Sequence, residues 1–221
     1  PKAAIYLDHA AATPLDERVL AAMQPYFSEK FFNPSATYWP AHEVAKDLEA
    51  ARAEVAHWLG ARPAEIIFTA GGTEANNLAI HGVMRQFPET NVVVSAIEHE
   101  SVLAPAHEYD CREVAVQKDG TIDLSALQKA IDERTVLVRI MYANNEIGTI
   151  DPIRAVAQIV TEICRVRQQK GNKLPLYFHT DAAQAANYLD LHAARLGVDL
   201  MTINGGKIYG PKQSGILFVS A

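Results

Sequence analysis

"LMTINGGKIYGPKQSGILFVS", residues 200–220, places Lys207 between two short β-rich runs. The runs "LMTIN", 200–204, and "GILFVS", 215–220, are apolar and bounded by glycine and proline, which is typical of strands in a sheet. Two glycines directly precede the lysine. A lysine on the protein surface needs no such small neighbours, so this stretch predicts an amine carried into a crevice at the end of a strand.

Other β-rich runs in the chain predict the rest of a sheet. Five of them precede residue 200, and helical patterns lie between them. They are "IIFT" 66–69, "NVVVS" 91–95, "REVAV" 112–116, "VLVRIMY" 136–142 and "LYFHTD" 176–181. Strands that alternate with helices indicate an α/β fold, so we expect a seven-stranded, mostly parallel sheet with helices on both faces.

Helical spacing of apolar residues is clear in three segments. These are residues 42–59, residues 123–131 with Asp123 as the N-cap, and the segment that follows Pro152. The first 40 residues are rich in Pro and Asn and predict irregular structure. We therefore expect an N-terminal arm over 1–40 and one large domain over 41–221.

The composition limits the classes of function. The chain has 221 residues, 49% hydrophobic and 21% charged, which suits a globular protein with a sizeable core. A net charge of −6 without a Lys/Arg run argues against a nucleic-acid partner. No apolar stretch approaches the roughly 18 to 20 residues that span a bilayer, and the first residues do not form a signal peptide. We expect a cytoplasmic protein without a membrane partner.

The cysteines and histidines do not form a metal-binding or disulfide pattern. Cys111 and Cys164 are too few for a disulfide framework and belong to no CxxC motif, so we expect buried, reduced thiols. His179 and Asp181 share one face of a predicted strand, but a third ligand at suitable spacing is missing. The sequence predicts no metal site.

Polar residues follow several predicted strands, where ligands bind in open α/β sheets. After 66–69 comes "AGGTEANN", in which Gly71, Gly72 and Thr73 lead directly into a helix. A glycine-rich turn at a helix N-terminus suits a phosphate, and the same letters also fit a plain tight turn. Both interpretations stay open on the residues alone.

Two further strand ends carry candidate polar groups. His99 follows the second predicted strand, and Asn144, Asn145 and Glu146 follow the fourth. A lone histidine is often a structural group, and "NNEIG" also fits an Asx turn closed by glycine.

Asp181 and Lys207 form the most informative pair. They end adjacent predicted strands, so an acid and an amine face one crevice. Gly205 and Gly210 have the separation found in a P-loop, but Pro-Lys follows them instead of Lys-Ser/Thr, so that match fails. A lysine that bonds to a carbonyl carbon and an acid beside a pyridine nitrogen are the recurrent features of a pyridoxal phosphate site.

The order of motifs resembles a known family. The motifs are "YLDHAAATP", "NPSATY", "FTAGGTEANN", "IEHESV", "YANNEIGTIDPI", "HTDAAQA" and "VDLMTINGGKIYGPKQSGILFV". Together they are similar to the cysteine desulfurases within the class V aminotransferases, which have pyridoxal phosphate fold type I. The resemblance covers essentially the whole chain.

The resemblance implies roles for individual residues. Lys207 would hold pyridoxal phosphate covalently, Asp181 would pair with the pyridine nitrogen, and His99 would stack on the ring and transfer protons. The remaining cofactor contacts are Gly72 and Thr73 to the phosphate, Gln184 to the phenolic oxygen, and Asn145 near that oxygen and the substrate carboxylate. The implied reaction takes sulfur from L-cysteine, leaving alanine and a persulfide, and supplies iron-sulfur cluster assembly.

The chain departs from the family pattern in three places. The family usually has Ser-x-His before the lysine, whereas this chain has Asn204, Gly205 and Gly206. Gln213 and Ser214 also replace the usual Gly and aliphatic residue. In the family a small C-terminal domain with the nucleophilic cysteine follows. We therefore expect weaker cofactor binding, with Asn204 compensating in part, and an incomplete active site.

Partners and rival functions also follow from the resemblance. L-cysteine is the implied substrate, a homodimer the implied assembly, and sulfur-acceptor proteins the implied partners. Another class V enzyme, such as a selenocysteine lyase or an aminotransferase, would share the same motifs. A truncated module that keeps the fold for binding alone is the alternative outside enzymology.

Overall fold

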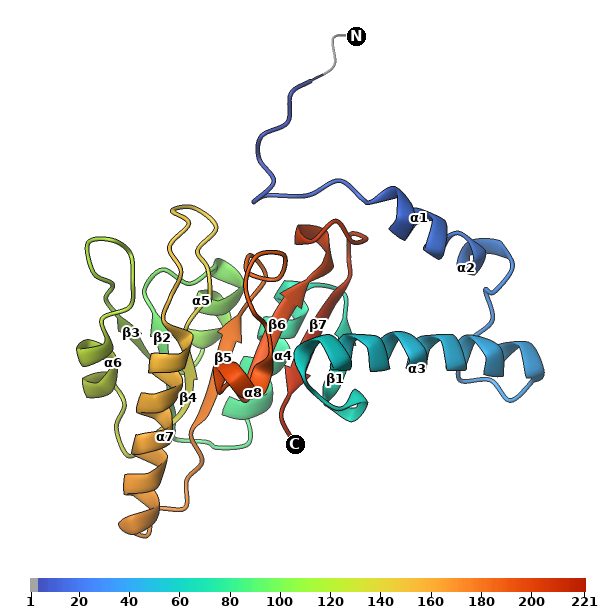
Figure 1. Ribbon diagram of the computed structural model, residues 1–221. Coiled ribbons are helices and arrows are strands. Elements are labelled where there is room, and N and C mark those ends of the chain that lie inside the picture. Colours follow the sequence, from blue (N-terminus) through green and yellow to red (C-terminus); the bar gives the residue numbers. More distant parts are fainter. Residues whose placement is uncertain (1–3) are drawn as a thin grey trace.

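A computed structural model describes residues 4–221, so the first three residues of the expected arm lie outside the described residues. Its centre is a seven-stranded sheet with the order β1-β7-β6-β5-β4-β2-β3 (Figure 1). The strands are β1 Ile66–Thr69, β2 Asn91–Ser95, β3 Asp110–Val114, β4 Thr135–Arg139, β5 Tyr177–Asp181, β6 Leu200–Asn204 and β7 Gly215–Val219. The seven strands predicted from the sequence are confirmed.

The sheet is mostly parallel, as predicted. Only β7 runs antiparallel to its neighbours β6 and β1. β1 is therefore parallel to the other strands, and the carboxyl ends of six strands point to one edge of the sheet. The short loop between β6 and β7 lies at this edge and begins with the 3-10 turn η2, Gly205–Lys207.

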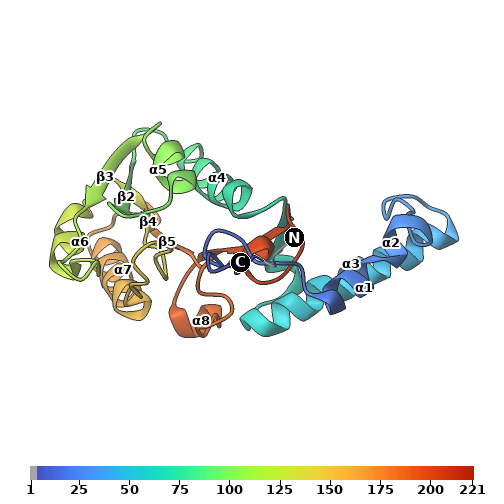
Figure 2. The same cartoon turned by 90° about the horizontal axis from the view of Figure 1, so that it is seen from above.

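Helices cover both faces of the sheet (Figure 2). On one face lie α4, Gly72–Met84, and α5, Glu100–Ala106. On the other lie α6, Leu124–Ala130, α7, Ile153–Gln169, and α8, Ala193–Leu196. The C-terminal end of α3, Trp39–Leu59, joins this second layer through Ala56 and Leu59.

Each face has its own hydrophobic core because the strand residues alternate between them. Ala79 and Ile80 of α4 pack with Val92 and Val94 of β2 on the first face. On the second face the core includes fully buried Phe178 of β5.

Local sequence signals explain where several helices begin and end. Asp123 caps α6, since its Oδ1 accepts from the N–H groups of Ser125 and Ala126, as predicted. α3 ends at Gly60, whose φ of 62° is left-handed. The 3-10 turn η1, Pro63–Glu65, then leads into β1.

Two predicted strands differ from the structure by more than one residue at an end. The run at 112–116 begins earlier and the run at 136–142 ends earlier, at Arg139. Beyond Arg139 the backbone still bonds to β5, with Ile140 N–H donating to His179 O and Tyr142 N–H to Asp181 O. The chain turns there because Asn144 begins a hydrogen-bonded loop.

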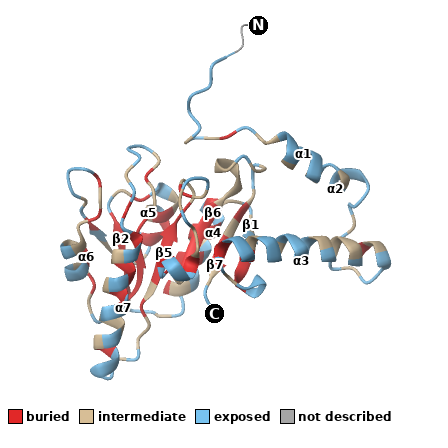
Figure 3. Ribbon diagram, in the orientation of Figure 1, coloured by how far each residue is buried: buried red, intermediate tan, exposed pale blue. Residues whose placement is uncertain are grey.

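The prediction of an irregular arm was wrong within residues 4–40. The arm contains α1, Glu17–Met23, and α2, Pro25–Ser28. Asp16 caps α1 by accepting from the N–H of Arg18, a local signal that the Pro and Asn content obscured. Residue 40, at which we expect the arm to end, lies in the first turn of α3, and the division into an arm and a large domain stays a prediction. Figure 3 shows that most of this region is exposed.

Within residues 4–221, no helix combines the length and the apolar character needed to cross a bilayer.

Candidate active site

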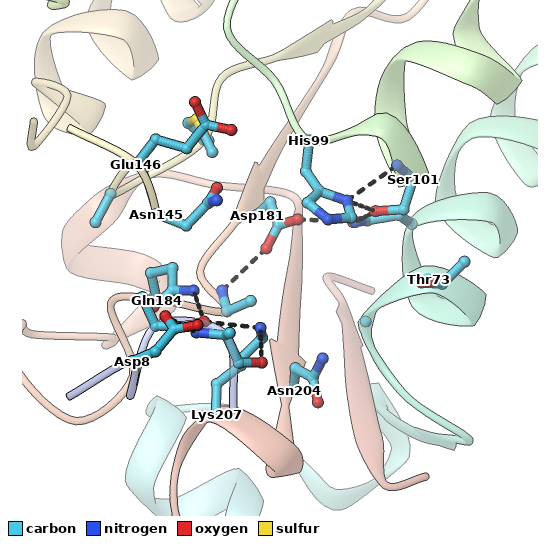
Figure 4. A pocket seen from close by; sticks show the side chains of 17 residues that line it. Asp8, Thr73, His99, Ser101, Asn145, Glu146, Asp181, Gln184, Asn204 and Lys207 are labelled. Atoms are coloured by element: carbon cyan, nitrogen blue, oxygen red, sulfur yellow. Dashed lines mark hydrogen bonds between the residues drawn. The ribbon is translucent and has the colours of Figure 1, made fainter. Parts of the chain in front are cut away.

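The carboxyl ends of the strands surround a pocket of about 480 Å³. It lies where the loops after β1, β2, β4, β5 and β6 meet (Figure 4). All the site residues that we expected from the sequence line it: Gly72, Thr73, His99, Asn145, Asp181, Gln184, Asn204 and Lys207. The topology therefore brings together residues that lie up to 135 positions apart, from Gly72 to Lys207.

Lys207 enters the pocket from η2, directly after β6. Its Nζ donates to the carbonyl oxygens of Ala10 at 2.8 Å and Ala11 at 2.7 Å. Burial lowers the pKa of Lys207, because the charged form loses hydration there. The amine becomes a nucleophile only after it loses its proton and releases these carbonyls.

Asp181 ends β5, the neighbour of β6, and is 8% exposed. One oxygen accepts from Asn76 Nδ2 at 2.8 Å and the other from the Ala183 N–H at 2.9 Å. Two donors therefore fix the direction of this carboxyl group beside the pocket.

His99 is the N-cap of α5 and is exposed to the pocket. Its Nδ1 accepts from the Ser101 N–H at 3.0 Å and lies 2.9 Å from Ser101 Oγ. A backbone N–H can only donate, so Nδ1 is the acceptor and a neutral ring carries its proton on Nε2.

Gly71 and Gly72 form the turn into α4. Gly71 has φ 148°, which a larger residue rarely adopts, and Gly72 is the first helical residue. Asn204 faces this turn, since a Cβ on Gly72 would lie 3.3 Å from Asn204 Nδ2. The Asn204 Oδ1 accepts from the Gly206 N–H, so the carboxamide also caps η2. Thr73 adds a hydroxyl to the same wall.

The loop after β4 contains the Asx turn that the sequence allowed. Asn144 Oδ1 accepts from the N–H groups of Glu146 and Ile147, and Gly148 closes the turn with φ 71°. Asn144 is thus structural, whereas Asn145 lines the pocket. Gln184 also lines it, and its Nε2 donates to Ala10 O at 2.8 Å.

Sequence reasoning missed the contacts made by the arm and by α4. Ala10 and Ala11 act through backbone carbonyls, which no side-chain pattern marks. Asn76 lies four residues after Gly72, one turn further along α4, and itself lines the pocket. Arg139 is a charge in a mostly apolar strand, and both signals were readable in the sequence.

Neither cysteine lines the pocket. Cys111 lies within β3 and Cys164 within α7, and both are half-buried. Burial raises the pKa of the Cys111 thiol to about 11 and also raises that of Cys164. Among residues 4–221, no three His, Cys, Asp or Glu side chains form a group that could hold a metal ion.

Comparison with known proteins shows the family to which the chain is similar. The family described as aminotransferase class-V matches residues 5–221. The cysteine desulfurase IscS of Dictyoglomus turgidum is 40% identical over 225 residues, which cover 99% of this chain and 54% of that protein. The cysteine desulfurase of Rattus norvegicus is 43% identical over 223 residues, covering 97% of this chain and 47% of that one.

Solved structures share the fold. A structure of SspA in complex with cysteine has a TM-score of 0.88 and 35% identity, covering 97% of this chain and 60% of that one. A NifS-like protein also has a TM-score of 0.88, with 33% identity over 97% of this chain and 58% of that one.

The chain spans about half the length of the curated relatives that it matches. The family match, by contrast, extends over nearly all of the chain and includes every residue of the pocket described above. The chain therefore belongs to the aminotransferase class-V family.

Proposed function

We propose that this chain carries the pyridoxal phosphate site of a cysteine desulfurase, within a large domain over 41–221 and with an arm over 1–40. One observation carries the proposal: Lys207 and Asp181 leave adjacent strand ends and line the same pocket. An amine and an acid in this relation suit a cofactor that has an aldehyde and a pyridine nitrogen.

The residues present fit this cofactor. The pocket volume of about 480 Å³ lies within the usual range for small-molecule sites. The Asp181 carboxyl is buried and held by two N–H donors, so it is ready to accept from a ring N–H. The Gly71-Gly72 turn exposes the first N–H groups of the 13-residue helix α4, which favour an anion such as a phosphate.

Each group of the chain then has a proposed task. Lys207 would hold the cofactor covalently, Asp181 would keep a proton on its ring nitrogen, and His99 would hold or donate a proton at Nε2. Gly72, Thr73 and Asn204 would bind its phosphate, while Gln184 and Asn145 would orient its phenolic oxygen and the substrate. Bound pyridoxal phosphate supplies an electron sink for bonds at the substrate Cα.

L-cysteine is the proposed substrate, supported by the named relatives and by the cysteine complex of SspA. Because neither Cys111 nor Cys164 lines the pocket, we propose that the thiol that receives the sulfur comes from outside this chain's own cysteines. We also propose that the chain passes sulfur to an acceptor protein for iron-sulfur cluster assembly. We propose further that it forms a homodimer and is located in the cytoplasm.

The first experiment adds pyridoxal phosphate to the purified chain. We expect a visible absorption band that borohydride removes, with the label mapped to Lys207. Lys207→Ala should lose the label, whereas the matched Lys212→Ala should keep it, since Lys212 donates to Thr13 O beside the pocket. A label on another lysine would refute the assignment.

A second experiment measures the products. With L-cysteine and an added thiol, we expect slow formation of alanine that requires Lys207. Without the added thiol we expect no alanine, either from the wild type or from the double variant Cys111→Ala/Cys164→Ala. Alanine formed rapidly without added thiol and dependent on either cysteine would refute the proposed external acceptor. Selenide from selenocysteine alone, or transfer of an amino group to a keto acid, would indicate a different class V activity.

A further inference from the structure

Arg139 is a charged residue at the carboxyl end of β4 and is fully buried. Burial lowers the pKa of its guanidinium to about 10, which still leaves it charged at neutral pH. Among residues 4–221 it takes part in none of the ion pairs shorter than 4.0 Å. A buried charge is costly unless polar groups compensate it, so its contacts are informative.

The guanidinium bonds to a side chain that leads to the pocket. Arg139 Nη2 donates to Asn76 Oδ1 at 2.9 Å, and Asn76 is 1% exposed. Arginine has no acceptor, so the carboxamide oxygen must face it and the NH₂ group must point away. On that side Asn76 Nδ2 donates to Asp181 Oδ2 at 2.8 Å and to Ser101 Oγ at 2.9 Å.

Hydrogen-bond donation runs in the same direction from Asn76 through Ser101 to His99. Since Ser101 Oγ accepts from Asn76, its own proton is free to go to His99 Nδ1 at 2.9 Å (Figure 4). Nδ1 is already an acceptor for the Ser101 N–H. Arg139 can only donate, and His99 Nδ1 accepts. The Asn76 carboxamide and the Ser101 hydroxyl between them can therefore satisfy both ends in one orientation only.

The other polar groups near Arg139 do not replace this bond. Glu98 Oε1 accepts from the Met141 N–H, and burial raises the pKa of Glu98 to about 8, so it is mostly neutral at pH 7. His179 Nε2 lies 3.5 Å from Arg139 Nη2 and 2.9 Å from Thr202 Oγ1, and its pKa is lowered well below the usual value by burial.

A second buried arginine bonds to the backbone instead of to a side chain. Arg167 is 3% exposed, and its Nη2 donates to the backbone carbonyls of Asp132 and Thr135. Asp132 precedes β4, and Thr135 is the first residue of β4. Both carbonyls therefore lie at the end of the sheet opposite the pocket. Arg167 thus holds backbone segments together, whereas Arg139 orients a side chain that contacts Asp181.

We propose that Arg139 is a positioning residue for the pocket: it orients the Asn76 carboxamide so that its NH₂ group holds Asp181 and Ser101, and through Ser101 the ring of His99. The part of this inference that concerns cofactor chemistry rests on the proposed function. Arg139 does not line the pocket itself and acts through Asn76.

The test uses the chain without added cofactor. Hydrogen exchange of the Asn76 side-chain NH₂ is measured by ¹⁵N NMR, with the amide of Asn77, which donates to Thr73 O in an exposed position, as the internal reference. We expect Asn76 to exchange at least about tenfold more slowly than Asn77. Equal exchange rates in the wild-type chain would overturn the proposal without any variant.

Variants then separate orientation from burial. Arg139→Gln places a group that can donate or accept, so it no longer dictates the orientation of Asn76, and we expect exchange to accelerate by about tenfold or more. Arg139→Lys keeps a donor-only cation and should remain close to the wild type. The matched control Arg167→Gln should change stability but leave Asn76 exchange unchanged. Acceleration in Arg167→Gln equal to that in Arg139→Gln would overturn the proposal.

A second readout uses ¹⁵N-labelled pyridoxal phosphate. In Arg139→Gln we expect the ring-nitrogen signal to move toward that of the deprotonated ring, because Asp181 is held less firmly, with rescue in Arg139→Lys. Absence of binding in the wild type would refute the proposed function, while the exchange measurement would still decide the role of Arg139. If Arg139→Gln does not fold, the wild-type exchange ratio and Arg139→Lys carry the test, and acceleration in the folded Lys variant would count against the proposal.

Discussion

The sheet with its covering helices and the arm before it are stabilised differently. Phe178 in the sheet is fully buried, whereas Phe27 on α2 of the arm is 71% exposed. α1 and α2 contain no buried residue, and the 21 residues of α3 contain only Ala41, Ala56 and Leu59 as buried positions. The sheet can therefore gain its stability from its own core, while the arm leaves most of its apolar surface in water.

The inner part of the arm nevertheless belongs to the site. Thr13 is 3% exposed, its Oγ1 donates to Gly206 O at 3.1 Å, and it accepts from the Tyr209 N–H at 2.8 Å. Together with the carbonyls of Ala10 and Ala11 on Lys207, these bonds attach the arm to the lysine loop. The arm is thus anchored at the lysine loop, and further along it Tyr26 and Lys30 bond to Asp47 of α3 on the surface.

The largest expected difference between the two regions is in core packing. Phe178→Ala should lower the free energy of unfolding by about 3–5 kcal/mol, because it leaves a cavity in the second face's core. Phe27→Ala should change it by less than about 0.5 kcal/mol in dilute solution, since the ring is exposed. Urea denaturation at constant pH measures both. Similar losses for the two variants would contradict the distinction between sheet and arm.

The two regions should also respond to pH in opposite directions. Burial raises the pKa of Glu98 from 4.5 to about 8, so the folded state binds this proton more tightly than the unfolded chain. Its stabilising contribution is complete below about pH 4.5 and is lost as the pH rises to about 8, by about 4–5 kcal/mol. In the arm, the bonds from Arg18 lower the pKa of Asp16 to about 2, so its contribution is lost as the pH falls.

Urea denaturation between about pH 5 and pH 8 tests the Glu98 prediction. Glu98→Gln should flatten the decline in that interval and be more stable than the wild type at the upper end. Asp151, whose pKa burial raises to about 6, contributes the same sign at the lower end, and buried His179, whose pKa is lowered, contributes the opposite sign. The difference between the wild type and Glu98→Gln at each pH therefore isolates Glu98. An unchanged slope in Glu98→Gln would show that another group titrates.

The exposed aromatic residues of the arm should support self-association. Phe27 on α2 and Trp39 on α3 are 71% and 70% exposed. If they meet a second copy, Phe27→Ala should weaken the association by about tenfold or more, as buried aromatic anchors do. Sedimentation over a range of concentrations measures the association. The variant leaves Phe178 and the rest of the sheet unchanged. A wild type that stays monomeric at every concentration would contradict this use of the arm.

The smallest expected effect lies at the junction between arm and sheet. Gly206→His with Asn204→Ser restores the donors that the family usually has before the lysine. A Cβ on Gly206 would lie 3.4 Å from Asn204 Oδ1 and 3.6 Å from Lys212 Cδ, so there is room for it. We expect pyridoxal phosphate to bind about tenfold more tightly through one added charge-assisted bond. Titration by absorbance decides it, and no change would mean that other groups hold the phosphate.

By itself the sequence determined the strands of the sheet and part of the pocket lining. The β-rich runs at 66–69, 91–95 and 200–204 coincide with strands β1, β2 and β6, because local side-chain patterns report local backbone preference. Asp181 and Lys207 could be placed together because parallel strands end at one edge of a sheet. The helix at Glu17–Met23 also had a local signal in Asp16, which composition alone concealed.

Only the tertiary structure decided the contacts between distant segments. The bond from Lys207 to Ala10 spans 197 positions, and the bonds from Asn76 to Asp181 and from Arg139 to Asn76 span 105 and 63. Backbone carbonyls carry no sequence signature, and the orientation of a carboxamide depends on which donor lies beside it in space. Such contacts follow from how two cores stack on one sheet, which local periodicity does not encode.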